Sequence, residues 1–252
     1  MKNFKKTIMV TGAGRIGSSV ALDLIRKGNN VLLGDIDKAR LLKTKKKINS
    51  KNLKTYQGDL TKKNNIDKFI KFGIKNFKKI HAAVYCSYPK SKKWGVSFEN
   101  LDEHYLNQDL QKQLGGSIIF CQRIIKRFIQ QKEGNLILIS SIQGVQAPKF
   151  EHYKNLNMSS PIEYSAIKSG IISITKYLSK YYRNKNIRVN CVSPGGIKDN
   201  QSNEFVKRYR KSCNSIGLIS DSDVSKLILF LLSDESKYIN GQNLIIDDGW
   251  TL

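Results

Sequence analysis

Two side chains with the residue types and spacing needed for proton transfer lie in the segment IEYSAIKSGIISITKYLSKYY. Tyr164 and Lys168 are four residues apart, and the apolar residues around them recur with helical spacing. Both side chains are therefore expected on one face of a helix. A nearby ammonium favours the phenolate form of a tyrosine, so the spacing predicts a lowered pKa for Tyr164. Such a tyrosine acts as a general acid or base towards a substrate oxygen.

A serine and a second tyrosine bear on this prediction. Ser141 ends the strand-like run NLILISS, where its hydroxyl would hydrogen-bond the same substrate oxygen and stabilise the charge that develops there. Tyr153 competes for the role of proton donor, but the residue four positions on is Asn157, which is not a cation. Pro148 and the Asn-rich flank favour a loop there. The sequence therefore favours Tyr164.

The elements that must position these residues alternate along the chain. Short apolar runs predict strands, and stretches of helical periodicity separate them. This alternation is typical of an α/β fold with a parallel, doubly wound sheet in a three-layer α/β/α arrangement. The length favours one domain over residues 1–252. The predicted strands cover 7–11, 30–35, 53–59, 80–86, 135–141, 187–193 and 242–249.

The first predicted strand runs directly into a glycine-rich loop that opens a helix. Gly12, Gly14 and Gly17 form G-x-G-x-x-G in this context. The first glycine permits a tight turn, the second lets the backbone approach a pyrophosphate, and the third allows close packing of the helix. The amino end of the helix then donates N–H groups to the phosphates. The loop predicts a dinucleotide-binding site.

Two acids end neighbouring predicted strands. Asp35 lies about 20 residues after the glycines, where an acid binds the adenosine ribose hydroxyls and repels a 2′-phosphate. NAD is therefore favoured over NADP, although Arg15 and Lys38 lie close by in the sequence. Asp59 ends the third strand and either contacts adenine or caps the next helix together with Thr61; both alternatives stay open.

Composition limits the other classes of function. The formal net charge is +24, but 35 of the 44 basic residues are lysines that are dispersed over helices and loops, which favours a solvated basic surface over a nucleic-acid footprint. The four cysteines are far apart, so neither a metal site nor a disulfide is expected. No apolar run of membrane-spanning length and no secretory signal are apparent, which predicts a cytoplasmic protein without a membrane partner.

The chain resembles the short-chain dehydrogenase/reductase family over nearly its whole length, through TGAGRIG, Asp35, GDLT, ISSIQG, YSAIK, RVNCVSPGG and INGQNLIIDDG. The resemblance implies a Rossmann-type domain with Ser141, Tyr164 and Lys168 as the catalytic trio. Gln113 stands where the family often has a helical Asn that holds a relay water. Asn190 is implied to shape the nicotinamide side. The residues implied at the cofactor are Gly12, Gly14, Arg15, Ile16, Gly17, Asp35, Asp59, Leu60, Cys86, Tyr164, Lys168, Pro194, Gly195 and Ile197.

Three segments are expected to line the substrate pocket: residues 88–94, 145–161 and 198–213. The Ser-to-Tyr spacing is about ten residues longer than the family usually shows, so 145–161 is expected to loop out at the mouth of the site, with His152 exposed to water. Residues 198–213 are expected to form a mobile lid. These loops resemble the subgroup called flagellin-modification protein A, which is linked to the biosynthesis of bacterial surface sugars.

The prediction is an NAD(H)-dependent oxidoreductase that interconverts a secondary alcohol and a ketone on a sugar. Basic residues in the three segments favour an anionic, phosphorylated or nucleotide-activated sugar, although general basicity explains them nearly as well. A 3-oxoacyl carrier-protein reductase and a non-catalytic dinucleotide-binding sensor or scaffold are the alternatives. The resemblance also implies a homodimer or homotetramer, formed through long helices at Leu101–Gln131 and Ile162–Tyr182.

Overall fold

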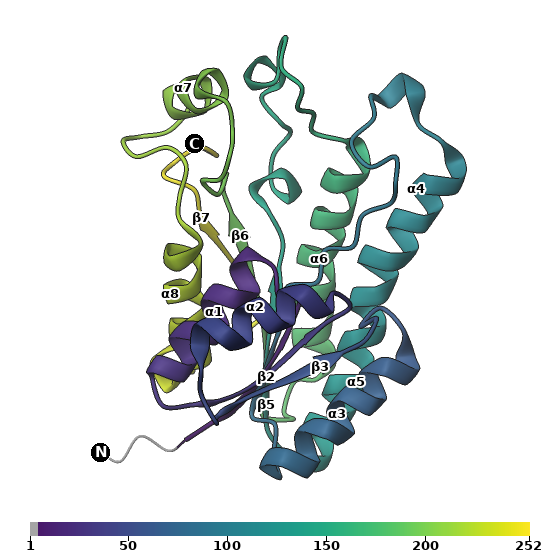
Figure 1. Ribbon diagram of the computed structural model, residues 1–252, viewed down its shortest axis with the longest axis vertical. Helices are drawn as coiled ribbons and strands as arrows, with labels where there is room; N and C mark the ends of the chain where they lie inside the picture. Colours follow the sequence, from purple (N-terminus) through teal and green to yellow (C-terminus); the bar gives the residue numbers. More distant parts are fainter. Residues whose placement is uncertain (1–4) are drawn as a thin grey trace.

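The structure, a computed structural model, describes residues 5–252, and within them seven parallel strands form one sheet with the order β3-β2-β1-β4-β5-β6-β7 (Figure 1). The order reverses between β1 and β4, where a doubly wound sheet opens a crevice for a ligand. The predicted parallel, doubly wound α/β fold is confirmed. The strands are β1 (Thr7–Thr11), β2 (Asn30–Asp35), β3 (Leu53–Gln57), β4 (Ala82–Tyr85), β5 (Gly134–Ile139), β6 (Ile187–Pro194) and β7 (Asn243–Ile246).

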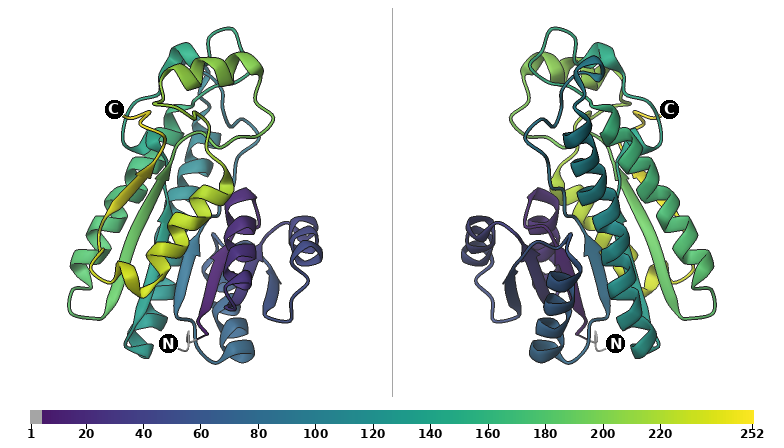
Figure 2. Two further views of the ribbon diagram at one scale, coloured as in Figure 1. Left: turned by 90° about the vertical axis from the view of Figure 1, so that its left-hand side faces the viewer. Right: turned by 90° about the vertical axis from the view of Figure 1, so that its right-hand side faces the viewer.

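Helices cover both faces of the sheet (Figure 2). One apolar core lies between the sheet and α1 and α8, and a second core lies between the opposite face and α3, α5 and α6. The five inner strands are buried on both faces, which explains their nearly continuous apolar sequences, whereas the edge strands β3 and β7 are only partly buried. The helices are α1 (Arg15–Arg26), α2 (Lys38–Ile48), α3 (Lys63–Phe77), α4 (Glu103–Asp109), α5 (Gly116–Gln131), α6 (Ile162–Tyr181), α7 (Asn203–Lys211) and α8 (Asp221–Leu232).

The helix expected over residues 101–131 is interrupted. Residues Leu110–Gly115 form a π-helical turn (η2) that joins α4 to α5. Such turns insert one residue per turn into a helix and recur at functional sites. Gln113 lies in this turn and is buried.

The loops at the carboxyl ends of the strands gather at one end of the molecule. Helix α7, the long connections on either side of it and the chain's carboxyl terminus lie together at the top of Figure 1. Among the residues that the structure describes, no helix combines the length and hydropathy that crossing a bilayer requires.

Candidate active site

Ser141, Tyr164 and Lys168 come together just beyond the carboxyl end of β5. The Ser141 hydroxyl lies near Tyr164, close enough to oppose the rise in the pKa of that tyrosine. Lys168 lies one turn further along α6, and its Nζ donates to the carbonyl oxygen of Ile139 at 3.1 Å. The Oγ of Ser140 donates to the Lys168 carbonyl oxygen at 2.7 Å, which fixes α6 against the end of β5.

The pKa values in this trio differ from the prediction. Burial raises the pKa of Tyr164, and the nearby Ser141 hydroxyl offsets only part of that rise. Burial also lowers the pKa of Lys168 to about 8. The expected lowering of the Tyr164 pKa is therefore wrong for the protein without a ligand. Lys168 Nζ lies 5.5 Å from the Tyr164 ring centroid and is engaged by a backbone carbonyl, so desolvation outweighs its charge.

Gln113 is 3% exposed, and neither of its amide atoms has a hydrogen-bond partner within residues 5–252. A buried, unpaired amide is costly unless a water or ligand completes its hydrogen bonds. The π-helical turn η2 packs against α6, the helix that carries Tyr164 and Lys168. The position therefore suits a residue that holds an ordered water.

The glycine loop has the shape that a dinucleotide phosphate requires. Gly12 has φ +82°, and a Cβ there would lie 2.8 Å from the Cys86 carbonyl oxygen. A Cβ on Gly17 would lie 1.9 Å from the Gly12 carbonyl oxygen, so helix α1 can approach the loop only with glycine there. In the described chain, no side chain caps α1 after Gly14, and a Cβ on Gly14 would meet open space. The amino end of α1, including Arg15 and Ile16, is thus available to an anion.

Asp35 and Arg15 lie on either side of this loop. Asp35 is buried at the end of β2, where its carboxylate accepts from the N–H groups of Ala13 (2.5 Å) and Asp37 (2.8 Å). Each oxygen keeps a lone pair for a ribose hydroxyl. Arg15 instead pairs with Asp199 at 3.0 Å and donates to the Lys198 carbonyl oxygen. Its guanidinium therefore ties the glycine loop to the segment before α7.

The other residues implied at the cofactor lie either in turns held by hydrogen bonds or in the apolar core. Asp59 accepts from Thr61 N (3.0 Å) and Thr61 Oγ1 (2.7 Å), so it closes the turn before α3. The N-cap of α3 is Lys62, and no side chain of the described residues caps that helix end, so neither Asp59 nor Thr61 is its cap. Leu60 is a buried core residue. Cys86 follows β4, and its N–H donates to the Thr11 carbonyl oxygen at 3.1 Å.

The segment after β6 is held in place by backbone contacts. Gly195 N donates to Ile246 O at 2.8 Å, and Ile197, three residues after Pro194, forms a bridge with Ile219. Asn190 lies further back in the strand, where its amide bonds to Ile239 O and Gln242 N. Those contacts support the loop before β7, which is a structural role away from the strand end.

The segment 145–161 and helix α7 form one packed unit. Ile142, Phe205, Tyr209, Leu218 and Trp250 form a separate apolar cluster, which we call the lid cluster, against which Tyr153 and Leu156 pack. Arg208 Nη1 donates to the carbonyl oxygens of Glu151 (3.2 Å) and Lys154 (2.5 Å). The long segment therefore docks onto α7 rather than looping freely.

His152 lies inside this unit. Its side chain is 2% exposed, and its Nε2 lies 2.9 Å from Ser212 Oγ. Its ring centroid lies 5.5 Å from that of Tyr209 and 6.0 Å from that of Trp250. The expectation of an exposed His152 is wrong, because side chains from α7 and the carboxyl terminus surround it. Burial lowers the pKa of His152.

Two buried acids near the trio are functional candidates that the sequence analysis missed. Asp109 accepts from Ser91 N (2.8 Å) and Ser91 Oγ (2.6 Å), which holds the segment 88–94 against α4. Glu163 precedes Tyr164, and burial raises its pKa. Each acid lies within a helix next to apolar residues, and that placement is the signal that could have indicated them.

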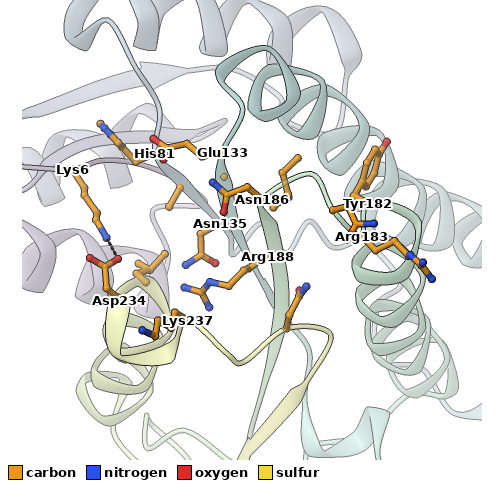
Figure 3. Close-up of a pocket in the computed structure, with 16 residues that line it drawn as sticks. Lys6, His81, Glu133, Asn135, Tyr182, Arg183, Asn186, Arg188, Asp234 and Lys237 are labelled. Carbon is orange, nitrogen blue, oxygen red and sulfur yellow. Dashed lines mark hydrogen bonds and ion pairs between the residues drawn. The ribbon is translucent and has the colours of Figure 1, made fainter.

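A cavity of about 390 Å³ lies at the opposite edge of the sheet, where β4, β5 and β6 begin (Figure 3). Several of its polar groups are already engaged: Lys6 pairs with Asp234 at 2.7 Å, and Asn135 Nδ2 donates to Leu231 O. Arg188 donates to four carbonyl oxygens around the end of α8. These contacts join α8 to the sheet, and the cavity is remote from Tyr164.

Cysteine and metal chemistry have little support in the described part of the chain. Cys86, Cys121, Cys191 and Cys213 are free thiols. Residues 5–252 contain no group of three or more His, Cys, Asp or Glu side chains arranged to hold a metal ion.

Comparisons with known proteins show which family and which relatives this chain resembles. Residues 12–251 match the family described as enoyl-(acyl carrier protein) reductase. The chain is 40% identical over 252 residues to the post-translational flagellin modification protein A of Campylobacter coli, with 98% of each chain covered. It is 28% identical over 255 residues to the 3-oxoacyl-[acyl-carrier-protein] reductase FabG of Thermotoga maritima, with 97% of each covered.

A solved structure agrees in fold and in sequence. The short-chain dehydrogenase of Leptospira borgpetersenii with bound NAD⁺ has a TM-score of 0.86 and 29% identity, and the match covers 100% of this chain and 97% of that one. With the curated relatives, this match assigns an oxidoreductase that uses a nicotinamide dinucleotide on CH–OH groups. The chain belongs to the short-chain dehydrogenase/reductase family.

Proposed function

We propose that the protein is an NAD(H)-dependent oxidoreductase that interconverts a secondary alcohol and a ketone on a sugar, with Tyr164 as the acid or base. The observation that carries this proposal is the convergence of Ser141, at the end of β5, with Tyr164 and with Lys168 one helical turn further on, whose Nζ lies 5.5 Å from the Tyr164 ring centroid. Two hydroxyls that converge beside a buried ammonium suit the oxygen of a CH–OH or C=O group.

The chain's own groups then have defined tasks. Because burial raises its pKa, Tyr164 holds its proton in the resting protein and donates it to the carbonyl oxygen during reduction. Ser141 hydrogen-bonds the same oxygen and stabilises its charge. A nicotinamide dinucleotide, when bound, supplies or accepts the hydride and in its oxidised form brings a positive charge. In the oxidation direction this positive charge favours the phenolate of Tyr164, which then acts as the base and takes the proton from the substrate hydroxyl.

Lys168 and Gln113 support proton supply to Tyr164. With a pKa near 8, Lys168 is largely protonated at neutral pH yet releases its proton at little cost. We assign Gln113 the role of holding a relay water, because its buried amide has no partner in the described chain. A water chain through Gln113 would connect the buried trio to solvent.

The preference for NAD rests on Asp35 and on the engagement of Arg15. A carboxylate at the end of β2 accepts from ribose hydroxyls and repels a 2′-phosphate. Arg15 is already paired with Asp199, so it is not free to attract that phosphate. The backbone of Gly12, Gly14 and Gly17 would hold the pyrophosphate.

The sugar substrate and the setting are also proposals. The name of the Campylobacter coli relative associates it with flagellin modification, and the segments 88–94, 145–161 and 198–213 carry many basic residues that suit an anionic sugar. We place the enzyme in the cytoplasm. A homodimer or homotetramer would cover the apolar side chains that α5 and α6 expose, namely Ile118, Ile129, Tyr177 and Tyr181.

The test is the Tyr164→Phe variant, with Tyr153→Phe as its matched control. NADH formation would be followed with a panel of phosphorylated and nucleotide-activated sugars, and NAD⁺ binding by calorimetry. Tyr164→Phe should lose about 10³-fold in kcat while NAD⁺ binding is unchanged, because only the proton transfer is removed. Tyr153→Phe should retain most of its turnover. Equal turnover by wild type and Tyr164→Phe would refute the assignment.

A second candidate is reduction of a 3-oxoacyl carrier-protein thioester. The family description and the Thermotoga maritima relative favour it. The same assay separates the two candidates, because a 3-oxoacyl thioester should oxidise NADH rapidly only if this second function is correct.

A further inference from the structure

Two aromatic side chains from the segment 88–94 stand against Tyr164. The ring centroid of Tyr88 lies 5.7 Å from that of Tyr164, and the centroid of Trp94 lies 6.1 Å from it. Tyr88 and Trp94 meet each other edge to face, with centroids 5.5 Å apart and planes at 86°. We call this pair the aromatic corner.

The aromatic corner is rigidly built from polar contacts. The buried carboxylate of Asp109 holds both the N–H and the hydroxyl of Ser91, between the two rings in sequence. Ser159 Oγ donates to the Gly95 carbonyl oxygen at 2.5 Å, directly after Trp94. Such fixed supports preorganise a binding surface. Tyr88 nevertheless remains 40% exposed, so the corner is not simply part of the core.

Positive charge lies beside the aromatic corner. Lys90 Nζ lies over the Tyr88 ring, 4.9 Å from its centroid, and Lys168 Nζ also lies over that ring, at 5.3 Å. Lys93 is neutralised by Asp102 at 3.1 Å, whereas the salt bridges found within residues 5–252 do not include Lys90. A ligand at the corner would therefore meet an aromatic face and a cation together.

We propose that the aromatic corner stacks against the C–H face of the substrate's pyranose ring, while Lys90 pairs with an anionic group on the same substrate. This inference rests on the proposed function and names the residues that select the sugar. The face of an aromatic ring carries negative charge density and attracts polarised C–H groups and cations. Stacking there brings a ring hydroxyl next to Tyr164.

A flexible acyl chain fits this surface less well. Two rings at right angles present a face and an edge, which complement a rigid ring more than a chain. The surroundings are also polar, since the Ser141 hydroxyl and the ammonium groups of Lys90 and Lys168 lie around Tyr164 and Tyr88. Burying a bare hydrocarbon against polar groups whose remaining hydrogen-bonding capacity it cannot satisfy is unfavourable.

The test measures KM and kcat of Tyr88→Leu and Lys90→Ala on a sugar phosphate and on its neutral parent sugar. Tyr88→Leu should raise KM for both sugars about tenfold, because it removes the stacking surface. Lys90→Ala should raise KM for the phosphate alone, and Lys43→Ala, at an exposed position on α2 outside the three pocket segments, is the matched control. Binding of NAD⁺ should be the same in all variants.

Different results would overturn the sugar subsite and the proposed function. If wild type oxidises sugars but Tyr88→Leu keeps its KM, the aromatic corner is not a sugar subsite and the proposed function stands. If Lys90→Ala affects phosphate and parent sugar equally, the ion pair is excluded. If wild type turns over thioesters and no sugar, both the proposed function and this inference are overturned.

Discussion

The proposed cofactor side and the proposed substrate side of the site are built in opposite ways. On the cofactor side, β1, the glycine loop, α1 and β2 are consecutive, and Gly12, Gly17 and Asp35 act through backbone geometry and nearby N–H groups. On the substrate side, the lid cluster joins Ile142, Phe205 and Trp250, which are far apart in the chain. Local sequence specifies the first side, and long-range packing specifies the second.

The difference explains which expectations failed. The segment 145–161 was expected to loop out at the mouth of the site with His152 exposed, but packing against α7 and the carboxyl terminus buries that side chain. Arg15 connects the glycine loop to the segment leading into α7, through its ion pair with Asp199 and its hydrogen bond to the Lys198 carbonyl oxygen. We therefore expect the two sides to respond differently to substitution.

The largest effect is expected from Lys168→Met, at the junction of the two sides. Turnover should fall by about 10³-fold. Stability should rise by about 3 kcal/mol at pH 7, because a buried ammonium whose pKa falls from 10.5 to about 8 destabilises the folded state. The unfolded chain binds the extra proton between these two values, so the gain is complete below pH 8 and vanishes above 10.5.

Thermal unfolding at several pH values measures this gain, with Lys176→Met on the exposed face of α6 as the control. A variant that is inactive and also less stable at pH 7 would show that Lys168 stabilises the fold.

His152→Ala tests the claim that the substrate side depends on packing. The cavity left in the lid cluster should lower the free energy of unfolding by about 2–4 kcal/mol and raise KM for substrate, with NAD⁺ binding retained. His152→Phe should restore part of the stability by refilling the space. His104→Ala, at an exposed position, is the control. Equal, small effects of both alanine variants would contradict the claim that packing around His152 specifies the substrate side.

The same histidine makes a pH prediction. Burial lowers the pKa of His152, so protonation favours the unfolded chain. The stability that wild type has over His152→Phe should therefore be present above about pH 6.5 and shrink as the pH falls below that value. Chemical denaturation of both proteins at several pH values checks it, and a difference that is constant with pH would contradict it.

Asp35→Ser tests the preference for NAD⁺ on the proposed cofactor side. Removal of the carboxylate should lower the preference for NAD⁺ over NADP⁺ by about tenfold or more, measured as the ratio of dissociation constants. KM for the substrate should change little. Asp37→Ser, at the exposed cap of α2, is the matched control; an unchanged ratio in Asp35→Ser would remove the basis for the NAD assignment.

The smallest effect is expected from Arg15→Met. Its ion pair with Asp199 is partly exposed, so its loss should cost no more than about 1 kcal/mol of stability. Arg26→Met, at the other end of α1, provides the control. A loss of substrate affinity as large as that of His152→Ala would mean that the two sides act as one unit.

The sequence by itself determined the doubly wound fold, the glycine loop and the spacing of Tyr164 and Lys168. These features follow from periodicity and from backbone rules that act over a few residues. The strand 7–11, for example, was predicted at its observed bounds.

Only the tertiary structure decided the protonation of Tyr164 and Lys168, the burial of His152 and the anchoring of Ser91 by Asp109. Each depends on atoms that distant segments bring together. Desolvation is set by everything that surrounds a group, and a one-dimensional pattern does not contain that information.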